Sequence, residues 1–164
     1  MSEAQYRSVG AGEGETLWFA GAHQTVKHPG AWSDGAFSLV EVMVPRGRAT
    51  PLHRDPSDET FYVLDGEMLF HIDGAEQLTS AGDTVSLRRG VAHAFVATSD
   101  VARFLVLNTP GTHDSYFRDG GEPATHTDLT AAPAPDYERL EASGKRHGIE
   151  MLGPPPFTKL QLAG

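Results

Sequence analysis

The stretch PLHRDPSDETFYVLDG (residues 51–66) decides how this chain folds. Its second half alternates apolar and polar residues and ends in an Asp-Gly pair, as a strand that runs into a tight turn does. Its first half places His53, Asp55 and Glu59 within seven positions. In an extended chain these three side chains have the same parity and face the same side. The stretch therefore predicts a strand that carries an imidazole and two carboxylates at one end.

The same face continues beyond the carboxylates as an apolar surface. A two-residue turn at 65–66 would join this strand to EMLFHI (67–72) as a hairpin, with the apolar side chains of both strands on one face. An apolar floor with polar groups at one end is the usual form of a small-molecule site. The predicted pocket residues on these two strands are Phe61, Val63, Met68 and Phe70. Phe95, on a later strand, is also predicted to line the pocket.

Other short strands flank this pair. They are AFSLVEVMV (36–44), DTVSLR (83–88), HAFVAT (93–98) and ARFLVLNT (102–109). Many short strands with turn signals about every 8 to 12 residues are typical of antiparallel barrels and sandwiches. The sequence therefore predicts an all-β antiparallel barrel with its core at about residues 36–109.

The remainder, residues 110–164, predicts a C-terminal extension that contains a helix. PDYERLEASGKRHG (135–148) fits a helix over about 136–147, with Asp136 as the N-cap and Gly148 just after the end. An extended tail follows the helix. Because the sequence contains no internal repeat, residues 1–164 are predicted to form one domain.

Composition narrows the possible partners. The chain of 164 residues has a net charge of −9, which argues against nucleic acid or an anionic membrane as a partner. It contains no cysteine, so a metal ion would have to bind His, Asp or Glu. The N-terminal residues do not resemble a secretory signal, and no apolar run reaches the ~18 residues of a membrane span. A cytoplasmic location is expected.

Two groups of residues resemble the two conserved motifs of the cupins. The first cupin motif, G-x5-H-x-H-x3-4-E-x6-G, is matched by Gly47, His53, Glu59 and Gly66, with Asp55 in place of the second histidine. The second motif, G-x5-P-x-G-x2-H-x3-N, is matched by Gly82, Gly90 and His93, with Arg88 and Ala97 in place of the proline and the asparagine. The flanking segments are similar to single-domain cupins described as quercetin dioxygenase-like.

The resemblance implies a fold, a metal and an assembly. The implied fold is a jelly-roll barrel, and the implied assembly is a homodimer. His53, Glu59 and His93 are implied ligands of one divalent metal ion, with Asp55 at the fourth ligand position. Two histidines and a carboxylate already suffice for a non-haem iron type of site. The metal could be Fe, Ni, Mn, Co or Zn.

Asp55 admits several roles on sequence grounds. It can bind the metal directly, or it can act as a general base beside the metal, as Glu59 also can. The two carboxylates and two histidines could also form an acid–base cluster without a tightly bound metal. Finally, Asp55 could be only a turn residue before Pro56.

Three functions remain open at this stage. The first is a metal-dependent oxygenase acting on a phenolic, flavonol-like or polyketide-type molecule, with Glu59 as the base. The second is a non-redox enzyme, such as a cyclase, isomerase, dehydratase or lyase of natural-product biosynthesis. The third is a small-molecule-binding barrel without catalysis. The first is favoured, because open metal positions, an apolar pocket and a base are all predicted.

Overall fold

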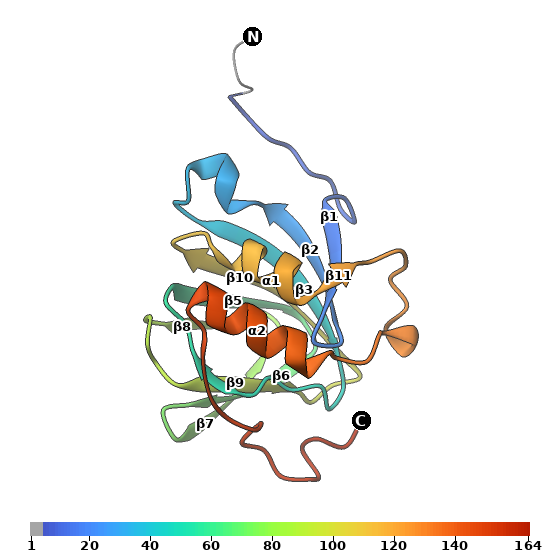
Figure 1. Cartoon of the computed structure of the whole chain (residues 1–164). Helices are drawn as coiled ribbons and strands as arrows, with labels where there is room; N and C mark the ends of the chain where they lie inside the picture. The colour runs from blue at the N-terminus through green and yellow to red at the C-terminus, as the bar shows by residue number, and fades with distance from the viewer. Residues whose placement is uncertain (1–4) are drawn as a thin grey trace.

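Two antiparallel β-sheets face each other in the computed structural model, which describes residues 5–164 (Figure 1). The larger sheet contains β1 (Glu15–Phe19), β2 (Ala22–His28), β3 (Ser38–Pro45), β5 (Asp58–Asp65), β8 (Thr84–Leu87), β10 (Val101–Thr109) and β11 (Glu122–Pro123). The smaller sheet contains β4 (Leu52–Arg54), β6 (Glu67–Ile72), β7 (Ala75–Ser80), β9 (His93–Ala97) and β12 (Glu150–Gly153). The predicted antiparallel β-barrel is therefore confirmed.

The order of strands shows how the chain is wound between the sheets. Within residues 5–164 the larger sheet has the order β11-β1-β2-β3-β10-β5-β8, and the smaller has the order β12-β4-β9-β6-β7. β3 and β10 are the central pair of the larger sheet, and each alternates buried and less buried residues along its length. That alternation places one face of each strand in the barrel interior.

Aromatic side chains join the two sheets across the interior. The ring of Phe61 in β5 lies 5.1 Å from that of Phe70 in β6 and 5.7 Å from that of Phe104 in β10, between ring centroids. Phe95 in β9 lies 5.5 Å from Phe104. The Phe61–Phe70 and Phe95–Phe104 contacts join opposite sheets, whereas Phe61 and Phe104 lie in the same sheet. Aromatic pairs at such separations are favourable.

The predicted hairpin at residues 65–66 is wrong. β5 pairs with β10 and β8, whereas β6 pairs with β7 and β9, so the chain turns a corner there from one sheet into the other. Gly66 has φ of 77°, and a Cβ at this position would lie 2.2 Å from the carbonyl oxygen of Val101. A two-residue Asp-Gly hairpin does occur one strand later, where Ile72 pairs with Ala75. The Asp-Gly pair specifies a tight turn but not the sheet that the next strand joins.

Helices α1 (His113–Gly120) and α2 (Tyr137–His147) follow the barrel strands and lie side by side (Figure 1). Asp136 caps α2 by accepting a hydrogen bond from the Arg139 amide at 3.0 Å, and Gly148 ends it with φ of 76°. The Ser143 hydroxyl donates to the Tyr116 carbonyl oxygen at 3.1 Å and joins the two helices. The predicted C-terminal helix is therefore confirmed.

Two short 3-10 helices, η1 (Gly30–Ser33) and η2 (Leu129–Ala131), lie in connecting segments. None of the helices formed by residues 5–164 is long and apolar enough to span a membrane. The predicted single domain covers residues 1–164. Its first four residues lie outside the described part of the chain.

Candidate metal centre

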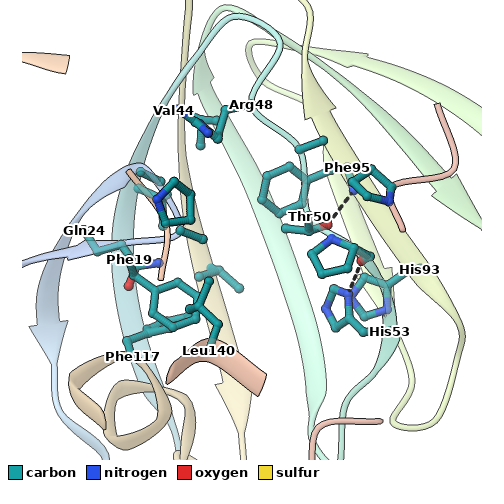
Figure 2. Close-up of a pocket in the computed structure, with 18 of the residues that line it drawn as sticks. Phe19, Gln24, Val44, Arg48, Thr50, His53, His93, Phe95, Phe117 and Leu140 are labelled. Atoms are coloured by element: carbon teal, nitrogen blue, oxygen red, sulfur yellow. Dashed lines mark hydrogen bonds between the residues drawn. The ribbon is translucent and has the colours of Figure 1, made fainter. Parts of the chain in front are cut away.

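A cavity of about 500 Å³ lies between the two sheets and is lined mainly by apolar side chains. Figure 2 shows His53 and His93 side by side on one wall, and Phe19, Gln24, Phe117 and Leu140 on the opposite wall. The lining residues come from both sheets, both α-helices and the C-terminal tail. The barrel thus contains a largely apolar chamber with imidazole groups on one side.

Both sheets contribute to the predicted cluster. His53 in β4 and His93 in β9 are paired across the smaller sheet, and their rings lie 4.4 Å apart between centroids. Glu59 comes from β5 in the larger sheet, and Asp55 lies in the connection between β4 and β5. The side chain of His53 is 14% exposed, and those of the other three are 2–5% exposed. The structure therefore brings together all four residues predicted as metal ligands.

The nitrogen and oxygen atoms of the cluster are close together. Oδ2 of Asp55 lies 3.2 Å from Nε2 of His53 and 3.4 Å from Nε2 of His93. Oε2 of Glu59 lies 2.8 Å from Nε2 of His93. Asp55 is thus in the middle of the cluster, and its proposed role as a mere turn residue is wrong.

Backbone carbonyl groups orient two of the imidazoles. Nδ1 of His53 lies 2.7 Å from the carbonyl oxygen of Pro51, and Nδ1 of His93 lies 2.9 Å from that of Val91. A carbonyl oxygen can only accept, so each Nδ1 carries the hydrogen and donates it. In the neutral rings the lone pair is then on Nε2, which faces the cluster, as in metal-binding histidines.

His113 is a member of the cluster that the sequence analysis missed. It is the first residue of α1, and its Nε2 lies 2.9 Å from Oδ1 of Asp55 and 3.5 Å from Oε1 of Glu59. Its Nδ1 lies 3.2 Å from the hydroxyl oxygen of Ser57. No spacing in the sequence signals this residue, because it reaches the barrel only through the placement of α1. The cluster gains a third imidazole from outside the two motifs.

Asn108 in β10 is a second missed residue. Its Nδ2 donates to Oε1 of Glu59 at 2.9 Å and lies 3.4 Å from the hydroxyl oxygen of Ser57. Asn108 is fully buried and pairs with Glu59 across β10 and β5. It therefore holds one carboxylate oxygen of Glu59 in place.

The carboxylates and imidazoles of the cluster shift one another's pKa values. Burial alone would raise the pKa of the Asp55 carboxyl, but contacts with His113 and His53 outweigh burial and lower this pKa well below its usual value. Burial alone would lower the pKa values of His93 and His113, but Glu59 acting on His93 and Asp55 acting on His113 raise them. Without a metal the cluster therefore favours ionised carboxylates beside protonated histidines, and a cation that binds there has to displace the protons from the imidazoles.

The cluster fits a divalent metal ion. Both oxygens of Asp55 and Oε2 of Glu59 are buried and form no hydrogen bond with acceptable geometry within residues 5–164, although imidazole nitrogens lie close to them. Ligands of a first-row metal lie about 2.0–2.2 Å from it, so that neighbouring ligand atoms lie about 3.0–3.4 Å apart. The separations of 3.2 and 3.4 Å between Oδ2 of Asp55 and the Nε2 atoms of His53 and His93 agree with that spacing, and the 2.8 Å between Glu59 and His93 is slightly shorter. Two sets of three residues meet the distance requirement for a metal site: His53, Asp55 and His93, and Asp55, Glu59 and His113.

The predicted pocket residues divide into two groups. Phe61 and Phe95 line the cavity, as predicted. Val63, Met68 and Phe70 share the inward face but do not line the cavity; they are at most 1% exposed and belong to the packed core. Phe70 contacts Phe61 and Phe95, so these aromatic rings separate the cavity from the core. Strand parity predicts the face of a residue but not how completely the interior beside it is filled.

The comparisons with known proteins agree with this architecture. Residues 40–108 match the family model described as a cupin domain. Quercetin 2,3-dioxygenase of Bacillus subtilis (strain 168) is 27% identical over 114 residues, which are 69% of this chain and 34% of that enzyme. The chain thus spans about a third of the length of this relative.

Solved structures show the same fold. A predicted oxalate decarboxylase from Thermotoga maritima superposes with a TM-score of 0.58 at 21% identity, covering 63% of this chain and 99% of that one. An RmlC-like cupin from Shewanella frigidimarina superposes with a TM-score of 0.55 at 18% identity, covering 70% and 99%. Residues 40–108 thus match a cupin domain, and these solved structures share its fold.

Proposed function

We propose that this protein is a metal-dependent oxygenase that acts on a phenolic, flavonol-like or polyketide-type molecule held in the barrel cavity. One observation carries the proposal: three imidazole nitrogens and two carboxylates converge beside a largely apolar cavity of about 500 Å³. The distant similarity to a quercetin 2,3-dioxygenase supports the same chemistry.

The chain's own residues fit the requirements for holding the metal. His53 and His93 present Nε2 to the cluster, and Asp55 and Glu59 present oxygens without hydrogen bonds. Nε2 of His113 lies beside Oδ1 of Asp55 and Oε1 of Glu59. A divalent transition metal bound there would polarise a substrate hydroxyl or carbonyl group and, if redox-active, support reaction with dioxygen.

Glu59 is the better placed of the two predicted bases. It lines the cavity, whereas Asp55 does not and lies behind the imidazoles. Asn108 holds Oε1 of Glu59, and Oε2 forms no hydrogen bond within residues 5–164. The Glu59 carboxylate is therefore the group that would accept the proton of a substrate hydroxyl group.

The cavity wall supports the same reaction class. Phe61, Phe95 and Phe104 line the chamber beside the cluster and provide flat apolar surfaces for an aromatic ligand. An apolar wall keeps bulk water away from a reactive intermediate and strengthens the electrostatic interactions inside. We therefore expect a substrate that is aromatic and carries a hydroxyl beside a second oxygen.

The test is oxygen uptake with quercetin, measured with an oxygen electrode after loading the protein with Fe, Mn, Co or Ni. The wild-type protein should consume oxygen as the flavonol absorbance falls. Glu59→Gln should lower turnover by about 100-fold or more, the usual scale for losing a general base. If quercetin and a panel of other phenolic ketones leave the oxygen level unchanged, the oxygenase proposal is wrong.

One feature favours a non-redox alternative. A second carboxylate, Asp55, stands where the cupin motif has histidine, so the donor set is more negative and suits a metal that acts only as a Lewis acid. A cyclase, isomerase, dehydratase or lyase would use such a site. Product formed in anaerobic buffer would support this alternative.

A further inference from the structure

Two polar side chains line the cavity away from the metal cluster. Figure 2 shows Gln24 and Arg48 separated from His53 and His93 by the open part of the cavity. Gln24 is in β2, and Arg48 is in the connection between β3 and β4. Neither is part of the motif match, and the proposed oxygenase chemistry gives neither a role.

Arg48 presents an uncompensated positive charge to the cavity. No side-chain hydrogen bond or ion pair joins it to another of residues 5–164, whereas nearby Arg46 points outward and pairs with Asp100 at 2.9 Å. Glu141 also lines the cavity, but its carboxylate pairs with Lys145 at 2.9 Å. The guanidinium of Arg48 is therefore free to bind an anion.

The backbone around Arg48 holds its side chain in this position. A Cβ at Gly21, in the turn between β1 and β2, would lie 2.6 Å from Nε and 2.8 Å from Cζ of Arg48. Gly21 has φ of 78°, a conformation that favours glycine. The absence of a side chain at Gly21 lets the guanidinium lie against the turn at the edge of the cavity.

Gln24 adds a second group that lacks a partner. It is 4% exposed, lines the cavity, and has an Oε1 atom that forms no hydrogen bond within residues 5–164. A buried amide without a partner is unfavourable unless a ligand satisfies it. Since the amide carries both an acceptor and donors, it can bind a carboxylate or a hydroxyl.

The strand register places Gln24 far from Glu59. Gln24 pairs with Val42, which pairs with Phe104, which pairs with Val63. Val63 is four residues along β5 from Glu59, which is about 13 Å of extended chain. A ligand that reaches both groups must be elongated.

We propose that the ligand carries an anionic group, most simply a carboxylate, that binds Arg48, and a polar group along its length that binds Gln24, while its other end lies at the metal cluster. The placement of the other end of the ligand at the metal cluster rests on the proposed function. The anion site at Arg48 does not depend on that function. Arg is well suited to this role, because its guanidinium forms two parallel hydrogen bonds with a carboxylate. The substrate class would then include aromatic or polyketide-type carboxylic acids as well as neutral phenolics.

The experiment compares 6-hydroxynaphthalene-2-carboxylate with 6-hydroxynaphthalene-2-carboxamide by isothermal titration calorimetry. The two probes have the same shape and differ in charge. The wild-type protein should bind the carboxylate about 10- to 100-fold more tightly, the range expected for a charge-assisted hydrogen bond. Arg48→Met should lose this preference, and Gln24→Leu should weaken binding of the carboxylate.

Arg46→Met is the matched control, because it makes the same change of charge outside the cavity and should keep the preference. Circular dichroism would verify that each variant is folded. Equal affinity for the two probes, binding of neither, or an unchanged preference in Arg48→Met would overturn the inference.

The titration is repeated after dialysis against a chelator. A preference that persists without metal supports the anion site even if no oxygenase activity is found. Oxygen uptake with neutral phenolics, together with equal binding of the two probes, would leave the oxygenase proposal standing and overturn only the anion site.

Discussion

At the scale of single residues, Asp55 connects the imidazoles of the cluster. Its two oxygens lie within 3.4 Å of Nε2 atoms from His53, His93 and His113, which come from β4, β9 and α1. A histidine in its place could offer only one nitrogen to a metal, whereas a carboxylate has two oxygens and can contact groups on two sides. The substitution within the motif and the additional histidine on α1 are therefore parts of one arrangement.

Asp55→Asn should weaken metal binding by about 10- to 100-fold or more, because the amide is neutral and a poorer ligand. The measurement is a metal titration of chelator-treated protein by calorimetry. Asp58→Asn is the control, since Asp58 pairs with Arg89 at the surface and should not affect the metal. Retained metal with turnover about 100-fold lower would instead assign Asp55 to proton transfer.

His113→Gln should also weaken metal binding, by about 10- to 100-fold, whether His113 binds the metal or orients the two carboxylates. The metal content of the purified protein, measured by mass spectrometry, tests this. His147→Gln changes a histidine on α2 that contacts only Asp119 among the acidic residues described, and it should retain the metal. Equal metal content in both variants would show that His113 has no part in the site.

At the scale of structural elements, Gly47 fixes the path of the C-terminal tail. It follows β3 with φ of 75°, and a Cβ there would lie 2.6 Å from the carbonyl oxygen of Leu162 and 2.9 Å from the amide nitrogen of Gly164. Leu162 also lines the cavity. The first glycine of the motif therefore provides both a left-handed turn and room for the tail.

Gly47→Ala should lower the free energy of unfolding by more than the about 1–2 kcal/mol expected for a left-handed alanine alone. Gly74→Ala isolates that backbone cost, because Gly74 has φ of 88° and open space at its Cβ position. Chemical denaturation of both variants gives the comparison. Equal losses of stability would mean that contact with the tail contributes nothing.

At the scale of the whole molecule, the larger sheet has an edge suited to association. β11 pairs with β1 only at Leu17 and Trp18, and the Ala124 amide donates to the Thr16 carbonyl oxygen at 2.9 Å, so the remaining edge of β1 lacks a strand partner among the described residues. Unpaired strand edges favour pairing with another chain. We propose that the protein forms a homodimer through this edge.

Sedimentation velocity at micromolar concentration should therefore show a species of twice the chain mass. Replacing Thr16 with proline would remove a backbone donor from the edge strand, and it should shift the equilibrium toward monomer if the dimer forms there. A wild-type protein that sediments only as a monomer contradicts the proposal.

The sequence by itself determined the local features of this protein. Alternation along each strand predicted the inward faces, because side chains alternate with a period of two wherever a strand forms. The resemblance to the two cupin motifs predicted that His53, Glu59 and His93 lie together, and Oε2 of Glu59 lies 2.8 Å from Nε2 of His93. The caps of α2 were equally visible, because capping depends on residues a few positions apart.

Only the tertiary structure decided the contacts between distant segments. It placed β6 in the opposite sheet from β5, brought His113 to Asp55, and left Gln24 and Arg48 in the cavity wall. Each of these depends on which surfaces pack together after the strands have formed. Residues far apart in the chain meet because burial of apolar surface selects one arrangement of the whole barrel, and no local pattern records that choice.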